Sequence, residues 1–195
     1  MNDAVEKSAA ERREYHRLEF RAGISLTALP AELKDDPQAL RSRLRSELRM
    51  LQWLRLENQQ ALIRDSLLRS QPALAPLLRM VDAKLNFLAA ELFSSDPLRT
   101  DYQPLRMSAT GIDFPWPEVL EPGSLWLLEI DPAGTDPALR LPAIIAGGDE
   151  RSEPGRAAAE FFALSAEDED TLASWIVARQ AKSLSRKAAK DQAEN

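Results

Sequence analysis

Three arginines stand close together near the start of the chain, at Arg12, Arg13 and Arg17. A guanidinium group presents a planar fork of donors that binds phosphate bidentately and also stacks on aromatic faces. A loop that carries three such groups suits a compact anionic ligand that contains bases. A solvated arginine-rich surface has the same composition, so the cluster by itself leaves both interpretations open.

A second polar cluster is the segment Ser108-Ala109-Thr110-Gly111, which Arg106 precedes. A hydroxyl group and an exposed backbone amide at such a place can meet a phosphate or the edge of a base. The pattern S-x-x-G is common in ordinary turns, however, so this segment also has a purely structural interpretation.

Each cluster adjoins a segment that is typical of a β-strand. From Leu18 to Ala28 apolar residues alternate strictly with polar ones, which predicts a strand with one buried and one solvated face. A second strand is expected over 105–114. The parity of its apolar positions shifts by one residue at Gly111, which predicts a bulge or a kink there.

The longest periodic segment, from Pro37 to Phe93, predicts two long helices joined by a tight reversal at 70–76, with Asp36 as the N-cap of the first helix. The second helix carries apolar residues in steps of four and three, the period of a coiled-coil seam. Its seam residues are Leu74, Leu78, Val81, Leu85, Leu88 and Leu92. The first helix carries a looser stripe through Leu40, Leu44, Leu48, Leu51, Leu54, Asn58, Ala61 and Leu62.

These stripes favour self-association, because a small neighbouring domain would not cover them. Leucine at both seam positions shifts the preference away from dimers and towards a tetramer. A helical hairpin that folds back onto its own barrel is the alternative.

Three further strands are expected, over 124–130, 139–146 and 156–162. Pro142 predicts that the strand over 139–146 lies near an edge of the sheet. Ser165 to Asp168 then fits a capping box at the start of a helix, which we expect to fray beyond Arg179 into a basic tail.

These elements predict an α+β fold: a small antiparallel barrel or sandwich, closed by one C-terminal helix. The first strand is separated from the others by the helices, which must therefore project as an arm. The expected units are a flexible tail at 1–11, a discontinuous barrel at 12–34 and 98–180, a helical oligomerisation insertion at 36–95, and a basic flexible tail at 181–195.

Composition excludes several classes of function. The chain has no cysteine and a single histidine, His16, so a cysteine or histidine metal site or a Ser-His-Asp relay is hard to build. We therefore expect no metal, and no paired catalytic carboxylates suggest an enzyme. The net charge of −6 disfavours nucleic acid and anionic membranes as partners. No segment looks like a signal peptide or a membrane span, so a cytoplasmic location is expected.

Taken in order, the two polar clusters resemble the motifs of the PilZ domain family. Residues 13–17 match its R-x-x-x-R loop, with Arg12 as an additional arginine in front. Ser108 and Gly111 match the last two fixed positions of its second motif, [D/N]-x-S-x-x-G. Residues 161–168 look like the end of a PilZ barrel, and the long helices resemble those of an atypical tetrameric PilZ-like subgroup.

The resemblance covers 12–29 and 105–180 for the barrel and 37–93 for the arm. It implies a small β-barrel that acts as a non-enzymatic cyclic di-GMP receptor. Arg13 and Arg17 would clamp the ligand, with Ser108 and Gly111 on the barrel side. One position departs from the family, because Arg106 stands where the motif has Asp or Asn. A guanidinium group can only donate, although it can still reach the O6 and N7 acceptors of guanine.

We therefore predict a PilZ-like cyclic di-GMP receptor or signalling adaptor, a homo-oligomer and most simply a tetramer, which passes its signal to a downstream protein partner. The chief alternative is an oligomeric interaction scaffold of the same fold that has lost the ligand. A nucleic-acid-binding barrel is a remoter alternative, disfavoured by the acidic balance and by the lack of clustered aromatic residues.

Overall fold

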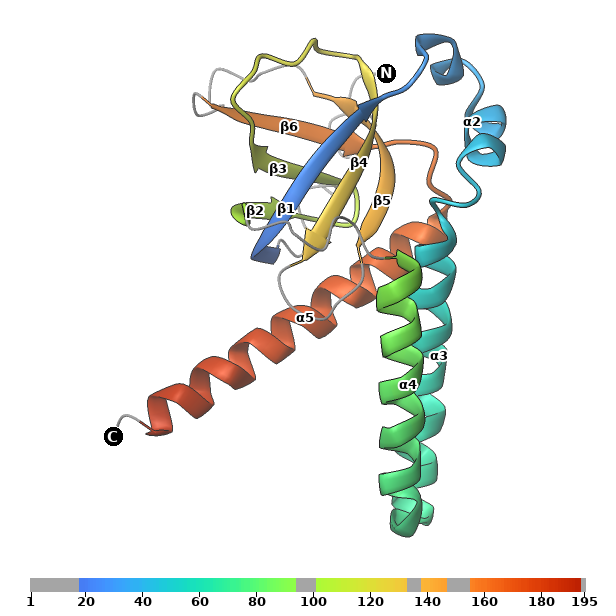
Figure 1. The fold of residues 1–195 in the computed structure, drawn as a ribbon, viewed down its shortest axis with the longest axis vertical. Helices are drawn as coiled ribbons and strands as arrows, with labels where there is room; N and C mark the ends of the chain where they lie inside the picture. The colour runs from blue at the N-terminus through green and yellow to red at the C-terminus, as the bar shows by residue number, and fades with distance from the viewer. Residues whose placement is uncertain (1–17, 94–100, 133–137, 147–154, 194–195) are drawn as a thin grey trace, which may run out of the picture.

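The structure, a computed structural model, describes residues 18–93, 101–132, 138–146 and 155–193. Among these residues, six antiparallel strands close into a barrel in the order β1-β2-β3-β6-β5-β4 (Figure 1). The strands are β1 (Leu18–Ala28), β2 (Gln103–Met107), β3 (Gly111–Pro115), β4 (Leu125–Pro132), β5 (Leu139–Ile145) and β6 (Arg156–Phe161). The predicted α+β fold with a small antiparallel barrel is confirmed.

The barrel closes through β1, which pairs with β2 along its first half and with β4 along its second half. The strict alternation of apolar residues in β1 fits this place, because one face of the strand turns into the barrel. Large side chains that are fully buried fill the interior: Leu105, Met107, Phe114, Leu128, Ile130, Leu139 and Leu141.

The segment around Gly111 differs from the prediction of one bulged strand. It forms two strands, β2 and β3, joined by a hairpin turn at Ala109 and Thr110. The backbone N–H of Ser108 donates to the carbonyl oxygen of Gly111 at 2.8 Å and closes the turn. A tight turn shifts the parity of apolar positions as a bulge does, so the sequence pattern could not separate the two.

The prediction that the strand around Pro142 lies near an edge is wrong, because β5 lies between β4 and β6 in the closed barrel. Its last pair with β6 joins Ala143 to Phe161, so Pro142 lies just beyond the paired residues. The carbonyl oxygen of Pro142 accepts a hydrogen bond from the backbone N–H of Phe162 at 2.8 Å. Because the N–H and C=O of one strand residue face the same neighbour, the missing N–H of Pro142 faces the end of β6 and leaves the pairing of β5 with β4 intact.

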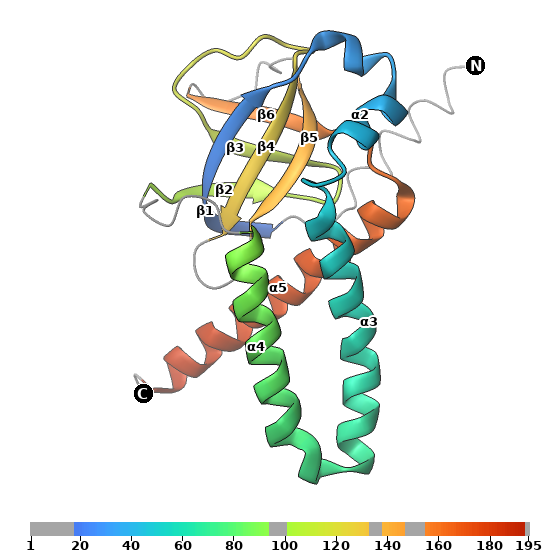
Figure 2. The same cartoon turned by 45° about the vertical axis from the view of Figure 1, so that its right-hand side comes forward.

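The helical insertion consists of α2 (Pro37–Arg43), α3 (Arg49–Ser70) and α4 (Ala75–Phe93). Asp36 caps α2 as predicted, since its carboxylate accepts from the backbone N–H groups of Gln38 and Ala39. Figure 2 shows α3 and α4 as an antiparallel pair that projects from the barrel as an arm.

The first of the two expected long helices is interrupted between α2 and α3. Its leucine stripe joins the hydrophobic core that the barrel and α5 form in the same chain. The buried members are Leu40, Leu44, Leu48, Leu51 and Leu54. This part of the insertion packs onto its own chain, as the alternative expected, whereas the α3–α4 hairpin itself projects as an arm.

The last helix, α5 (Ala166–Ala193), crosses beside the barrel and the base of the arm (Figures 1 and 2). Its predicted capping box is confirmed, because Ser165 and Asp168 exchange hydrogen bonds between backbone N–H and side-chain oxygen. Leu172 and Ile176 are buried against the barrel. The helix runs on to Ala193, beyond Arg179, where the sequence predicted fraying.

Candidate functional site

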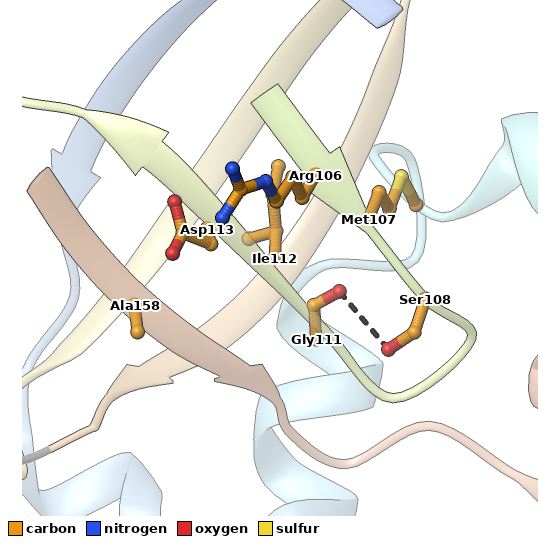
Figure 3. A pocket seen from close by; sticks show the side chains of 7 residues that line it. All are labelled: Arg106, Met107, Ser108, Gly111, Ile112, Asp113 and Ala158. Atoms are coloured by element: carbon orange, nitrogen blue, oxygen red, sulfur yellow. Dashed lines mark hydrogen bonds between the residues drawn. The ribbon is translucent and has the colours of Figure 1, made fainter. Parts of the chain in front are cut away.

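A hollow of about 250 Å³ opens on the outer face of the barrel, beside the β2–β3 hairpin. Figure 3 shows the side chains that line it. They are Arg106, Met107, Ser108, Gly111, Ile112, Asp113 and Ala158. The structure thus brings together three of the residues that the sequence proposed as ligand contacts: Arg106, Ser108 and Gly111.

Strand alternation explains why these residues share one face. Along β2 and β3, Leu105, Met107 and Ile112 are buried in the barrel, so Arg106 and Asp113 point outwards. Arg106 and Asp113 are direct cross-strand partners, and Figure 3 shows their side chains next to each other.

Arg106 is held by a carboxylate on its other side. Its Nε donates to Oε1 of Glu19 at 2.9 Å, across the pairing of β2 with β1. The side chains of Arg106 and Glu19 are 51% and 74% exposed, so this ion pair is screened by water. Arg106 is therefore free to exchange Glu19 for another acceptor at little cost.

Ser108 and Gly111 form the end of the hairpin. The hydroxyl group of Ser108 lies 3.3 Å from the carbonyl oxygen of Gly111 and 3.3 Å from Oγ1 of Thr110. A Cβ atom on Gly111 would lie 2.6 Å from the carbonyl oxygen of Ala159 in β6. Glycine is thus required for the close packing of β3 on β6, which gives this motif position a structural reason of its own.

Arg156 of β6 pairs with Asp113 at the far side of the hollow. Charges of alternating sign therefore run across four strands, from Glu19 through Arg106 and Asp113 to Arg156. The sequence analysis missed Asp113 and Arg156. Asp113 stands two positions after Gly111, which places both on one face, but only the register of the hairpin sets Asp113 opposite Arg106.

Arg12, Arg13 and Arg17 lie outside the described residues. The described chain begins at Leu18, which is the cross-strand partner of Met107. Arg17 directly precedes Leu18 in the sequence, and Met107 lies between Arg106 and Ser108. The arginine motif is therefore connected to β1 at the point where β1 pairs with the strand that carries Arg106.

The residues of the predicted coiled-coil seam of α4 differ in burial: some are half-buried and others are exposed. Leu78 and Leu85 are half-buried, on the side where Asp82 pairs with Arg64 of α3 at 2.9 Å, and Leu74, which directly precedes α4, is half-buried as well. The other side of the helix is exposed and mostly apolar, with Lys84 among its apolar residues, and we call it the outer face of α4. Its large apolar residues are Leu77, Met80, Val81, Phe87, Leu88 and Leu92, which are 42–75% exposed.

A buried carboxylate ties this arm to the barrel end of α5. Asp168 accepts from Arg41 of α2 at 2.8 Å and from Arg55 of α3 at 3.1 Å, while also accepting from Ser165. Burial disfavours its charged form, but the hydrogen bonds from Ser165 and Arg41 outweigh burial, so the pKa of Asp168 is lowered from its usual value.

No group of three or more histidine, cysteine or acidic side chains that could hold a metal ion occurs in the described part of the chain. Within the same residues, none of the helices is both long enough and apolar enough to cross a membrane.

No family model and no curated protein sequence matches the chain. A solved structure does match it, that of a pathogenic protein from Xanthomonas campestris described as a new tetrameric PilZ domain self-assembled via an unusual helical bundle. The match covers 94% of this chain and 99% of that one, with a TM-score of 0.57 and 19% sequence identity. The fold is PilZ-like. The similarity extends over both the PilZ-like barrel and the helices, since nearly all of each chain is aligned.

Proposed function

We propose that this protein is a non-enzymatic receptor or signalling adaptor for cyclic di-GMP, which assembles through its arm and acts in the cytoplasm on a downstream protein partner. One observation carries the proposal: Ser108 and Gly111, the matched residues of the second PilZ motif, line a hollow on the outer face of the barrel. The chain that bears the arginine motif enters the barrel at the same place, through Leu18 opposite Met107.

Cyclic di-GMP carries two phosphates and two guanines, and each part has a suitable partner here. Arg13 and Arg17, with Arg12 beside them, supply forks of donors for the phosphates and planar faces for the bases. Ser108 offers a hydroxyl group at the rim of the hollow. Arg106 can leave its exposed pair with Glu19 and donate to O6 and N7 of a guanine.

Titration calorimetry with cyclic di-GMP tests this proposal. The double variant Arg13→Ala/Arg17→Ala is expected to lose at least tenfold in affinity, because each charge-assisted hydrogen bond contributes roughly 1.5–3 kcal/mol. Arg21→Ala is the matched control, since Arg21 is an exposed arginine of β1 that instead donates to the backbone oxygen of Tyr102. Equal affinity in the wild type and the double variant would place the ligand elsewhere.

The homo-oligomer of the proposal rests on the outer face of α4. Six large apolar side chains on one face of a single helix are more than a monomer usually leaves in water, and a second copy of the same helix offers the matching surface. The similar Xanthomonas campestris protein is described as self-assembling via a helical bundle. We propose that the arms of several copies pack together in the same way, most simply as a tetramer.

An oligomeric scaffold without a nucleotide ligand is the second candidate. The observation that favours it is Arg106, a donor at the position where the motif has an acceptor, already engaged by Glu19. The same titration separates the two candidates. A scaffold gives no heat with cyclic di-GMP in the wild type, while the protein remains an oligomer by light scattering.

A further inference from the structure

The acceptor that Arg106 cannot provide is present on the neighbouring strand. Asp113 is the direct cross-strand partner of Arg106, points to the same outer face and lines the same hollow. Figure 3 shows its carboxylate at the side of the hollow, next to the Arg106 side chain. We infer that Asp113 is the residue that recognises guanine here, by accepting from its N1–H and N2–H donors. The inference rests on the proposed function and adds a specificity-determining residue to it.

The hydrogen bonds of Asp113 leave room for a ligand. Arg156 contacts Oδ1 of Asp113 through two nitrogens and donates to its backbone oxygen. Among the described residues, no donor contacts Oδ2. An ionised carboxylate has about four lone-pair sites, so Oδ2 can accept further bonds while Oδ1 stays paired. The Asp113 side chain is 40% exposed, whereas that of Arg156 is only 17% exposed. The more buried Arg156 therefore holds the carboxylate in place, and a ligand can reach the carboxylate from the solvent side.

Guanine chemistry makes this assignment selective. The Watson–Crick edge of guanine places two donors next to an acceptor, and a carboxylate opposite the donors accepts from both. Arg106 beside it is a donor that suits O6. The pair Arg106 and Asp113 thus matches both kinds of group on one base edge, with the acceptor supplied from β3 instead of β2.

The test compares two ligands that differ at one group. Cyclic di-inosine monophosphate lacks the 2-amino group of cyclic di-GMP and keeps O6, N7 and the phosphates. If Asp113 accepts from the 2-amino group, the wild type binds the inosine ligand roughly ten- to a hundredfold more weakly than the guanosine ligand. If arginines alone read the base through O6 and N7, the two ligands bind equally.

Variants assign the difference to Asp113. Asp113→Asn keeps an oxygen for Arg156 but turns an amide donor towards the base, so this variant should bind both ligands more weakly than the wild type and with equal affinity. Asp113→Glu retains the carboxylate and should keep a preference for guanosine. Glu19→Gln is the matched control, because Glu19 is an exposed carboxylate on the opposite side of Arg106, and it should leave the preference unchanged.

The outcomes separate this inference from the proposed function. Equal affinity of the wild type for both ligands, or a preference that survives in Asp113→Asn, overturns the role of Asp113 and leaves the receptor standing. A wild type that binds neither ligand overturns both. If Asp113→Asn does not fold, the double variant Asp113→Asn/Arg156→Gln removes both charges together and carries the same prediction.

Discussion

Replacing Asp168 with alanine should loosen the joint between arm and barrel and destabilise the whole protein. The change removes the hydrogen bonds of its carboxylate to Ser165, which cap α5, and its contacts with Arg41 and Arg55. Loss of a helix cap costs about 0.5–2 kcal/mol, and a hydrogen bond to a charged group contributes roughly 1.5–3 kcal/mol.

The loss of stability should be smaller than the sum of these contributions, because Arg41 and Arg55 keep other partners when Asp168 is removed. Arg41 also donates to the carbonyl oxygen of Ala163 at 2.7 Å, and Arg55 also pairs with Glu167 at 2.8 Å. The Arg41 and Arg55 side chains are 38% and 28% exposed, so water can hydrate part of each guanidinium group after Asp168 is lost. We expect a loss of about 3 kcal/mol in the free energy of unfolding, at the lower limit of the roughly 3–5 kcal/mol lost when one partner of a fully buried ion pair is removed. For a chain of this size that lowers the midpoint of thermal unfolding by roughly 6–12 °C.

Thermal and urea unfolding at one fixed protein concentration measure this loss. Glu167→Ala is the matched control: it removes a carboxylate one position away that also pairs with Arg55 but is 67% exposed, so we expect less than about 1 kcal/mol. A loss in Asp168→Ala no larger than in Glu167→Ala would refute the account of Asp168 as the joint.

The same carboxylate predicts a dependence on pH. Because the folded protein lowers the pKa of Asp168, its charged form stabilises the fold above the pKa of the unfolded chain. This contribution is lost as the pH falls through the folded pKa. The difference in the free energy of unfolding between the wild type and Asp168→Asn should therefore be largest at neutral pH and decrease below about pH 4. A difference that is constant from pH 7 to pH 3 would contradict the charge-based account.

Three other substitutions test separate parts of the structure. Gly111→Ala should cost about 1–3 kcal/mol in unfolding experiments, because its Cβ meets the carbonyl oxygen of Ala159; an unchanged melting temperature would show that β6 can yield. Val81→Glu/Leu88→Glu should reduce the mass measured by light scattering without lowering helix content by circular dichroism, since both side chains are exposed in the single chain. Arg106→Ala should weaken cyclic di-GMP about tenfold in calorimetry and leave thermal unfolding unchanged; an unaltered affinity would remove Arg106 from the site.

Local signals in the sequence were sufficient where a single element decides the outcome. The alternation from Leu18 to Ala28 gave the exact limits of β1, and Asp36 and Ser165 cap the helices that they were expected to cap. These features depend on neighbours within a few residues, so their physics can be read without the fold.

Features that depend on distant partners could not be predicted in the same way. The leucines from Leu40 to Leu54 have the spacing of any helical face, and only the packed structure shows that they join the core shared by the barrel and α5 of the same chain. Pro142 looked like an edge residue because nothing in the sequence reveals where β6 ends. Asp113 escaped notice because a cross-strand neighbour is defined by register, which the hairpin turn sets.

The insertion of the arm between β1 and β2 has a consequence for the order of folding. Glu19 and Arg106 pair across the β1–β2 ladder although 87 positions separate them along the chain. In an unstructured chain, closing so long a loop has an entropic cost that contacts must offset. Once α3 and α4 have formed their hairpin, the two ends of the loop are carried back to one place and most of that cost has already been met. Barrel closure should then follow helix formation. Any partner that holds the hairpin together, including another copy of the arm, would by mass action also hold the barrel closed.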